Sequence, residues 1–246
     1  MPIPPEWNLT GRKALVVTNG LGWTPTLVQA LQEAGAQVGV VAHTAEGLRG
    51  MQGLALSLRA DVTDPVQVRQ AVARMHQHMG RIDILVHNTQ VVLGKPFLDT
   101  TIQEFDRVFQ FNVRAAWLVC QEVARVMLAQ RYGRMVLIAS GLAERGNWNL
   151  SAYCASMAAL TNLVHTLALE LGRSNIRVNG IGPGWMSLEE KPLEEQQKEL
   201  LVRYLPIRRY GHPRDLVGLL VYMCSEACDY LTGHTVYIDG GAMIHP

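Results

Sequence analysis

The residues Lys13-Ala14-Leu15-Val16-Val17-Thr18 are followed by Asn19-Gly20-Leu21-Gly22-Trp23 and then by Thr24-Pro25. The first run is apolar and rich in β-branched residues, which predicts a buried strand. The glycines indicate a turn, and the apolar spacing from Thr26 to Ala34, closed by Gly35, predicts a helix. A buried strand, a glycine-containing turn and a helix are typical of the first unit of a parallel α/β sheet.

The same alternation of apolar runs and amphipathic segments continues to the end of the chain. Further strands are predicted at 38–42, 54–60, 82–87, 134–139, 176–181 and 235–238, and helices at 65–79, 102–112, 113–130, 153–171 and 215–224, with a helical flap at 189–203. Asp64 and Pro65 form an N-terminal signal for the second helix. Near-continuous apolar strands separated by helices predict one doubly wound (Rossmann-type) parallel sheet with helices on both faces. Nothing divides the pattern, so we expect a single domain over residues 1–246.

Composition excludes several classes of function. Of the 246 residues, 48% are hydrophobic and 17% charged, and the net charge is +1, which argues against a nucleic-acid partner. No apolar run was expected to reach the ~20 residues of a membrane span. The start of the chain lacks the basic and apolar blocks of a signal peptide, so a cytoplasmic protein is expected. The four cysteines and eight histidines show no metal-ligand spacing, and no metal site is predicted.

The stretch Tyr153-Cys154-Ala155-Ser156-Met157 carries the main chemical signal. Residues four apart share one face of a helix, so a lysine four positions after a tyrosine can stabilise the phenolate. The unperturbed pKa of tyrosine is about 10, and such a cation helps it to work as an acid or base near neutrality. Met157 carries neither a charge nor a hydrogen-bond donor, so the tyrosine stands without that cation.

Ordered landmarks over essentially the whole length support a family assignment. They are Asp61-Val62, Asn88, Asn112, Ser140 thirteen positions before Tyr153, Ile176-Arg177-Val178-Asn179 leading to Pro183-Gly184, and Asp239-Gly240-Gly241. In this order and spacing, the chain resembles the short-chain dehydrogenases/reductases. The resemblance implies that Ser140 orients a substrate carbonyl, Tyr153 transfers a proton and Asn112 supports a proton-relay water. The family's lysine corresponds here to Met157.

The resemblance also implies an NAD(P) site at the carboxyl ends of the strands. Its residues would be Asn19, Gly20, Gly22, Asp61, Val62, Asn88, Pro183 and Gly184. In the family loop, Thr-Gly-x-x-x-Gly-x-Gly, Asn19 replaces the first glycine and Thr24 the third. Asn19 is expected to tolerate a positive φ, Thr24 to cap the helix and compete for the phosphate-binding amides, and Trp23 to crowd the site.

Two further departures surround the same ligand. Gln90 stands where the family's Asn-Asn-Ala-Gly turn has a glycine that lets the backbone pass close to the cofactor. After the second strand there is no carboxylate for the ribose of NAD. Only the basic residues His43 and Arg49 favour NADP, and the nucleotide preference stays open.

Three functional hypotheses follow. The clustered departures favour a protein that has lost NAD(P)-dependent hydride transfer, a pseudoenzyme that binds a small molecule or serves as a partner subunit. The resemblance implies assembly through the two long helices, as a homo-oligomer (dimer or tetramer) or with an active family member. The first alternative is an active NAD(P)H-dependent reductase of a small carbonyl or alcohol that uses Ser140 and Tyr153. The second is cofactor-free Ser/Tyr chemistry resembling that of halohydrin dehalogenases.

Overall fold

The computed structural model describes residues 5–189 and 191–244. Its centre is a seven-stranded parallel sheet in the order β3-β2-β1-β4-β5-β6-β7. The strands are β1 (Lys13–Thr18), β2 (Gln37–Ala42), β3 (Leu56–Arg59), β4 (Ile84–Asn88), β5 (Gly133–Ile138), β6 (Ile176–Pro183) and β7 (Thr235–Ile238). The predicted fold class is confirmed.

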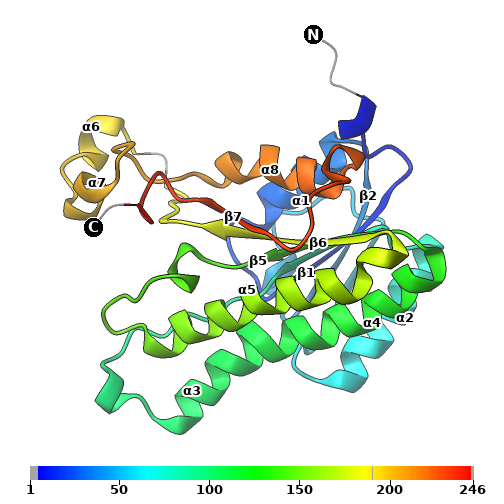
Figure 1. The fold of residues 1–246 in the computed structure, drawn as a ribbon, viewed down its shortest axis with the longest axis horizontal. Coiled ribbons are helices and arrows are strands. Elements are labelled where there is room, and N and C mark those ends of the chain that lie inside the picture. The colour runs from blue at the N-terminus through cyan, green and yellow to red at the C-terminus, as the bar shows by residue number, and fades with distance from the viewer. Residues whose placement is uncertain (1–4, 190, 245–246) are drawn as a thin grey trace.

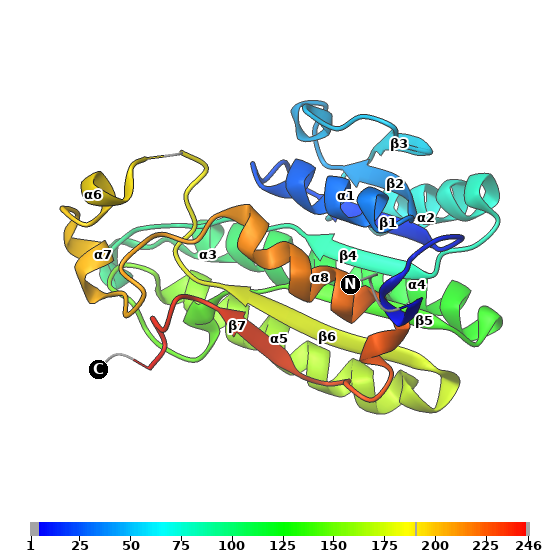
Figure 2. The same ribbon diagram turned by 90° about the horizontal axis from the view of Figure 1, so that it is seen from above.

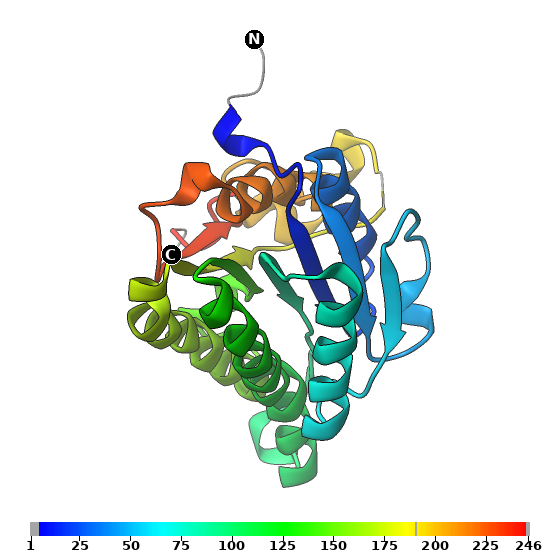
Figure 3. The ribbon, with the colours of Figure 1, turned by 90° about the vertical axis from the view of Figure 1, so that its right-hand side faces the viewer.

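Helices cover both faces of the sheet (Figures 1 and 3). One face carries α1 (Thr24–Glu33) and α8 (Val217–Cys224), and the other carries α2 (Pro65–Met79), α4 (Ala115–Gln130) and α5 (Ser151–Leu171). Each face has its own apolar cluster, because alternate side chains of the buried strands point to opposite sides. This double burial explains why the strands read as almost continuous apolar runs.

The strand order places a crevice at the carboxyl ends of β1 and β4. From β1 the chain moves outward to β2 and β3, and then returns to the other side of β1 with β4. Thr18 and Asn88, the last residues of these two strands, are paired neighbours. In doubly wound sheets, ligands bind in the crevice outside the strand ends where the order reverses. The topology therefore selects this edge before any side chain is considered.

Most helix boundaries agree with the sequence pattern. Asp64 caps α2 as predicted, because its carboxylate accepts the amides of Val66 and Gln67. One difference is the π-helical turn Gln110–Arg114, which separates α3 (Ile102–Phe109) from α4. Such turns are frequent at functional sites, and this one contains Asn112.

The predicted flap at 189–203 forms two short helices rather than one. They are α6 (Leu193–Gln196) and α7 (Leu200–Tyr204), while Glu190 lies outside the described residues. Figure 2 shows both helices beyond the carboxyl ends of the strands. The flap therefore lies at the same edge of the sheet as the crevice.

The longest helix, α5, departs from the expectation that no segment has the character of a membrane span. Ser151–Ser174 is long and apolar enough to cross a membrane, judged by length and composition alone. In the fold, α5 packs over the sheet, with Met157, Leu160 and Val164 fully buried. Core packing accounts for its apolar composition.

Candidate active site

Two elements bring Ser140 and Tyr153 together at the carboxyl edge of the sheet. Ser140 lies two residues after the end of β5 and Tyr153 lies in the first turn of α5. Both residues are buried and line one hollow together with Pro183 and Gly184, which end and follow β6. The Oγ of Ser140 accepts the amide of Leu142 at 3.2 Å. Its own proton is directed at the neighbouring Tyr153 oxygen, so the two side chains form a hydrogen-bonded pair.

The tyrosine lies in an environment that favours its neutral form. Burial raises the pKa of Tyr153 above its ordinary value, and a hydrogen bond from Ser140 offsets only part of this rise. Met157 is fully buried in the apolar cluster around α5 and contributes no charge. At neutral pH, Tyr153 therefore carries its proton and can act as an acid.

Gln90 is the direct partner of this tyrosine. The Tyr153 hydroxyl donates to Gln90 Oε1 at 3.1 Å, and Gln90 Nε2 donates to the carbonyls of Ile138 (3.0 Å) and Ala139 (2.7 Å). The sequence singled out Gln90 only as a side chain in place of a glycine. The structure shows its amide bridging the tyrosine and the end of β5.

Asn112 is fully buried and connects two parts of the site. Its Oδ1 accepts the amide of Val91 at 2.7 Å, and its Nδ2 donates to the Val91 carbonyl (3.1 Å) and to Ser156 Oγ (2.9 Å). Ser156 in turn donates to the carbonyl of Tyr153 at 2.7 Å. Asn112 thus connects the turn after β4 with α5. Ser156 was not singled out in the sequence, where a serine inside a helix gives no functional signal.

The loop after β1 is held in a way that the sequence did not predict. Gly20, not Asn19, takes the positive φ, at +98°. The Asn19 side chain instead pairs with the backbone of Gln90: Nδ2 donates to its carbonyl at 2.8 Å and Oδ1 accepts its amide at 3.1 Å. The expectation about Asn19 is therefore wrong, because the flexible glycine next to it makes the turn. Asn19 joins the first loop to the turn after β4.

The expected cap by Thr24 is also wrong. Thr24 is the first residue of α1, and its hydroxyl contacts Thr18 Oγ1 at 3.0 Å and accepts from Asn88 Nδ2 at 3.0 Å. The indole of Trp23 donates to Asn88 Oδ1 at 3.1 Å. Both side chains therefore hold the start of α1 against the end of β4. The Thr24 hydroxyl does not accept from the first amides of α1, so these amides stay free.

The backbone of this loop suits a diphosphate. Within the described part of the chain, the amides of Leu21, Gly22 and Trp23 have no hydrogen-bond partner. Unpaired amides before a helix form a ready anion site. A Cβ added at Gly22 would lie 2.4 Å from Cδ1 of Leu188, the residue just before the flap, so this side chain lies closely over the loop. A side chain at position 22 would require the end of the Leu188 side chain to move.

The other end of the crevice suits the nucleoside half of a dinucleotide. His43 follows β2 and its buried Nδ1 lacks a hydrogen-bond partner, although Asp61 Oδ1 lies 3.5 Å away. The His43 ring packs edge-on against Phe111. Val62 is fully buried next to Asp61. An orphaned ring nitrogen, an unpaired amide cradle and a fixed crevice together fit NAD(P).

Arg145 is a site residue that the sequence reasoning missed. It lies in the loop between Ser140 and α5, and it lines the hollow that contains Ser140 and Tyr153. Its Nη1 donates to the carbonyl of Ala242 at 2.7 Å. A lone arginine between the two landmarks was the only available signal, because its contact partner lies 97 positions away.

Comparisons with known proteins show the family of this chain. Residues 16–243 match the family model described as Enoyl-(Acyl carrier protein) reductase. The chain is 32% identical to the 5-keto-D-gluconate 5-reductase of Escherichia coli (strain K12), over 97% of this chain and 98% of that protein. A short-chain type dehydrogenase/reductase from Mycobacterium marinum superposes with a TM-score of 0.87 at 35% identity, over 96% of this chain and 97% of that one. The chain belongs to the short-chain dehydrogenase/reductase family.

A third similarity concerns the ligands. The structure of a gluconate 5-dehydrogenase from Burkholderia cenocepacia J2315, in complex with NADP and tartrate, superposes with a TM-score of 0.87 at 27% identity. The alignment covers 98% of each chain. Together with the E. coli reductase, it corrects the expectation that this chain is a pseudoenzyme. Full-length relatives carry the names of reductases and dehydrogenases, so the departures clustered in the first loop, the turn after β4 and α5 did not justify assigning a loss of function.

Proposed function

We propose that this protein is an NAD(P)-dependent oxidoreductase that interconverts a small ketone and the corresponding secondary alcohol. The observation that carries the proposal is the placement of Ser140 and Tyr153 in one hollow, next to a crevice whose backbone amides are unpaired. The names of the relatives support the same reaction class.

The coenzyme, when bound, supplies or accepts a hydride at the substrate carbon. The amides of Leu21, Gly22 and Trp23 would hold its diphosphate, and His43 and Asp61 would face its nucleoside half. In this family, the first loop is usually richer in glycine. We propose that the side-chain bonds of Asn19 and Thr24 replace those glycines as the means of holding the loop.

The protein's own part in reduction is to bind the carbonyl and deliver a proton. Ser140 donates a hydrogen bond to the carbonyl oxygen, and Tyr153 transfers its phenolic proton to the same oxygen as negative charge develops there. General acid catalysis of this kind contributes about 10² to 10⁴-fold in rate. Because Met157 stands where the family has lysine, we propose that Gln90 orients the phenol in place of a cation.

The test combines coenzyme binding with turnover. Fluorescence titration with NADH and NADPH should give a micromolar Kd for at least one of them, and NAD(P)H oxidation should be detected with a panel of small ketones. Tyr153→Phe should keep the coenzyme affinity and lose the oxidation. Failure of the wild-type protein to bind either coenzyme would reject the function.

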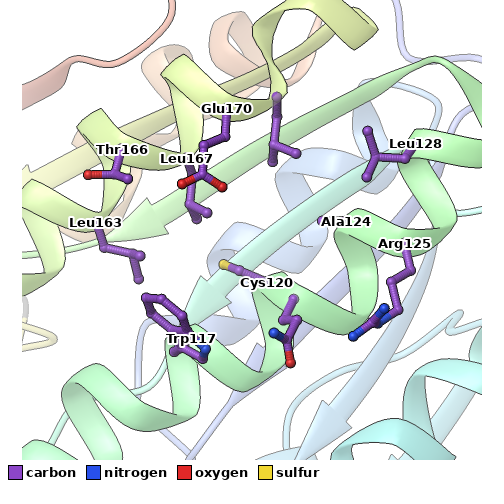
Figure 4. A pocket seen from close by; sticks show the side chains of 11 residues that line it. Trp117, Cys120, Ala124, Arg125, Leu128, Leu163, Thr166, Leu167 and Glu170 are labelled. Atoms are coloured by element: carbon purple, nitrogen blue, oxygen red, sulfur yellow. The ribbon is translucent and has the colours of Figure 1, made fainter.

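We also propose a homo-oligomer that forms through α4 and α5. A hollow between these helices is lined by apolar side chains from both, as Figure 4 shows for Trp117, Leu128, Leu163 and Leu167. The side chains of Trp117 and Leu128 are 55% and 41% exposed, respectively. Contact with a second copy would remove this apolar surface from water.

A further inference from the structure

The hollow at Ser140 and Tyr153 contains one unpaired cation. Arg145 uses Nη1 for its bond to the Ala242 carbonyl. No carboxylate among the described residues pairs with it. A guanidinium has five N–H donors. Arg145 is an exposed residue at the hollow, and its bond to the buried Ala242 leaves most of its donors open.

The acidic residue of the same hollow is already engaged. Asp239 Oδ1 accepts the amide of Gly241 at 2.9 Å and its Oδ2 accepts the amide of Met243 at 2.7 Å. These bonds hold the chain after β7 and disperse the charge of the carboxylate. The remaining lining is largely apolar, with Leu142, Leu150 and Trp185 among its members. An apolar hollow with one available cation suits a small molecule that bears one negative group.

We infer that Arg145 binds a carboxylate of the substrate, so that the substrates are small hydroxy acids and keto acids. A guanidinium fork matches a carboxylate in geometry, and it can form two parallel hydrogen bonds with it. Arg145 lies five residues after Ser140, so the acid group and the reacting carbonyl would be held from one loop. The inference rests on the proposed function, and it agrees with relatives named for a keto-gluconate and solved with tartrate.

The decisive experiment compares two ligands that differ only at the acid group. D-Gluconate and D-sorbitol share the polyol chain, with a carboxylate in the first and a CH₂OH group in the second. Calorimetric titration of the full chain, with and without NADP⁺, should show gluconate binding at least 10-fold more tightly than sorbitol. One charged hydrogen-bond pair accounts for a preference of about 10- to 100-fold.

Variants connect the preference to one side chain. Arg145→Gln should abolish the preference for gluconate, and Arg145→Lys should retain part of it. Arg173→Gln should leave the preference unchanged, because that exposed arginine lies just before the start of β6, at the end away from the site. Equal affinities for the two ligands in the wild type, absence of gluconate binding, or a preference that survives in Arg145→Gln would each overturn the inference. A separate titration with NADP⁺ alone tests the proposed function, and failure of that function would appear there as absence of coenzyme binding.

Discussion

Replacing Gln90 by leucine removes the acceptor that holds the Tyr153 hydroxyl, and the effect on the tyrosine can be worked out from the structure. The bond from the Tyr153 hydroxyl to Gln90 Oε1 is 3.1 Å long and buried. A neutral hydrogen bond of this kind contributes about 0.5–1.5 kcal/mol. Only the protonated phenol can donate it, so its loss destabilises the neutral form. Since 1.36 kcal/mol corresponds to one pKa unit, the pKa of Tyr153 should fall by about 0.4–1.1 units.

The measurement is the pH dependence of ketone reduction by NAD(P)H. In the wild type, burial holds the pKa of Tyr153 above its ordinary value, so the acid form persists through neutrality and activity is lost only on the alkaline side. Gln90→Leu should move this alkaline limb to lower pH by the amount given above. The leucine also leaves the Ile138 and Ala139 carbonyls without the Gln90 amide, so we expect a loss of about 1–3 kcal/mol in the free energy of unfolding.

A matched control separates the two effects. Gln70 is exposed on α2, and Gln70→Leu should change neither the alkaline limb nor the stability appreciably. Spectroscopic titration of the phenol, taken as the difference between each protein and its Tyr153→Phe derivative, gives the pKa without turnover. An alkaline limb and a phenol titration that both stay in place in Gln90→Leu would refute the assignment of Gln90 as the partner of Tyr153.

Three further outcomes are expected. Met157→Lys should lower the pKa of Tyr153, seen as faster alcohol oxidation at lower pH, and should lower Tm because the new cation is buried; an unshifted pH profile would count against this. Burial lowers the pKa of His87 to about 3, so stability is complete above pH 6.5 and falls as the unfolded chain takes up a proton. The free energy of unfolding should drop by about 2 kcal/mol from pH 7 to pH 5 through this group, a drop that denaturant titrations should find in His165→Asn and not in His87→Asn. Trp117→Glu should shift the mass measured by light scattering toward that of the monomer, and an unchanged mass would reject α4 and α5 as the interface.

Much of the architecture could be predicted because it depends on local signals. Apolar runs predicted the seven strands and Asp64 and Pro65 predicted the start of α2, while the family resemblance implied that Ser140 and Tyr153 lie together. Such features depend on side-chain period, on capping and on which strand ends share an edge. The loss of function inferred from the clustered departures at Asn19, Thr24, Gln90 and Met157 went beyond these signals. It took the departures clustered in the first loop, the turn after β4 and the catalytic helix as a missing activity, whereas the family relatives are named as enzymes.

By itself, the sequence determined the order of the strands and helices, the parallel sheet and the edge at which the site lies. Only the tertiary structure decided how the altered positions are used. Asn19 binds the backbone of Gln90 across 71 positions, the Gln90 amide reaches Tyr153 across 63, and Arg145 is anchored at Ala242 across 97. The physical reason is that a hydrogen bond needs two groups within about 3 Å in a definite direction. Residues distant in the chain meet this condition only after the sheet has placed the ends of their strands side by side.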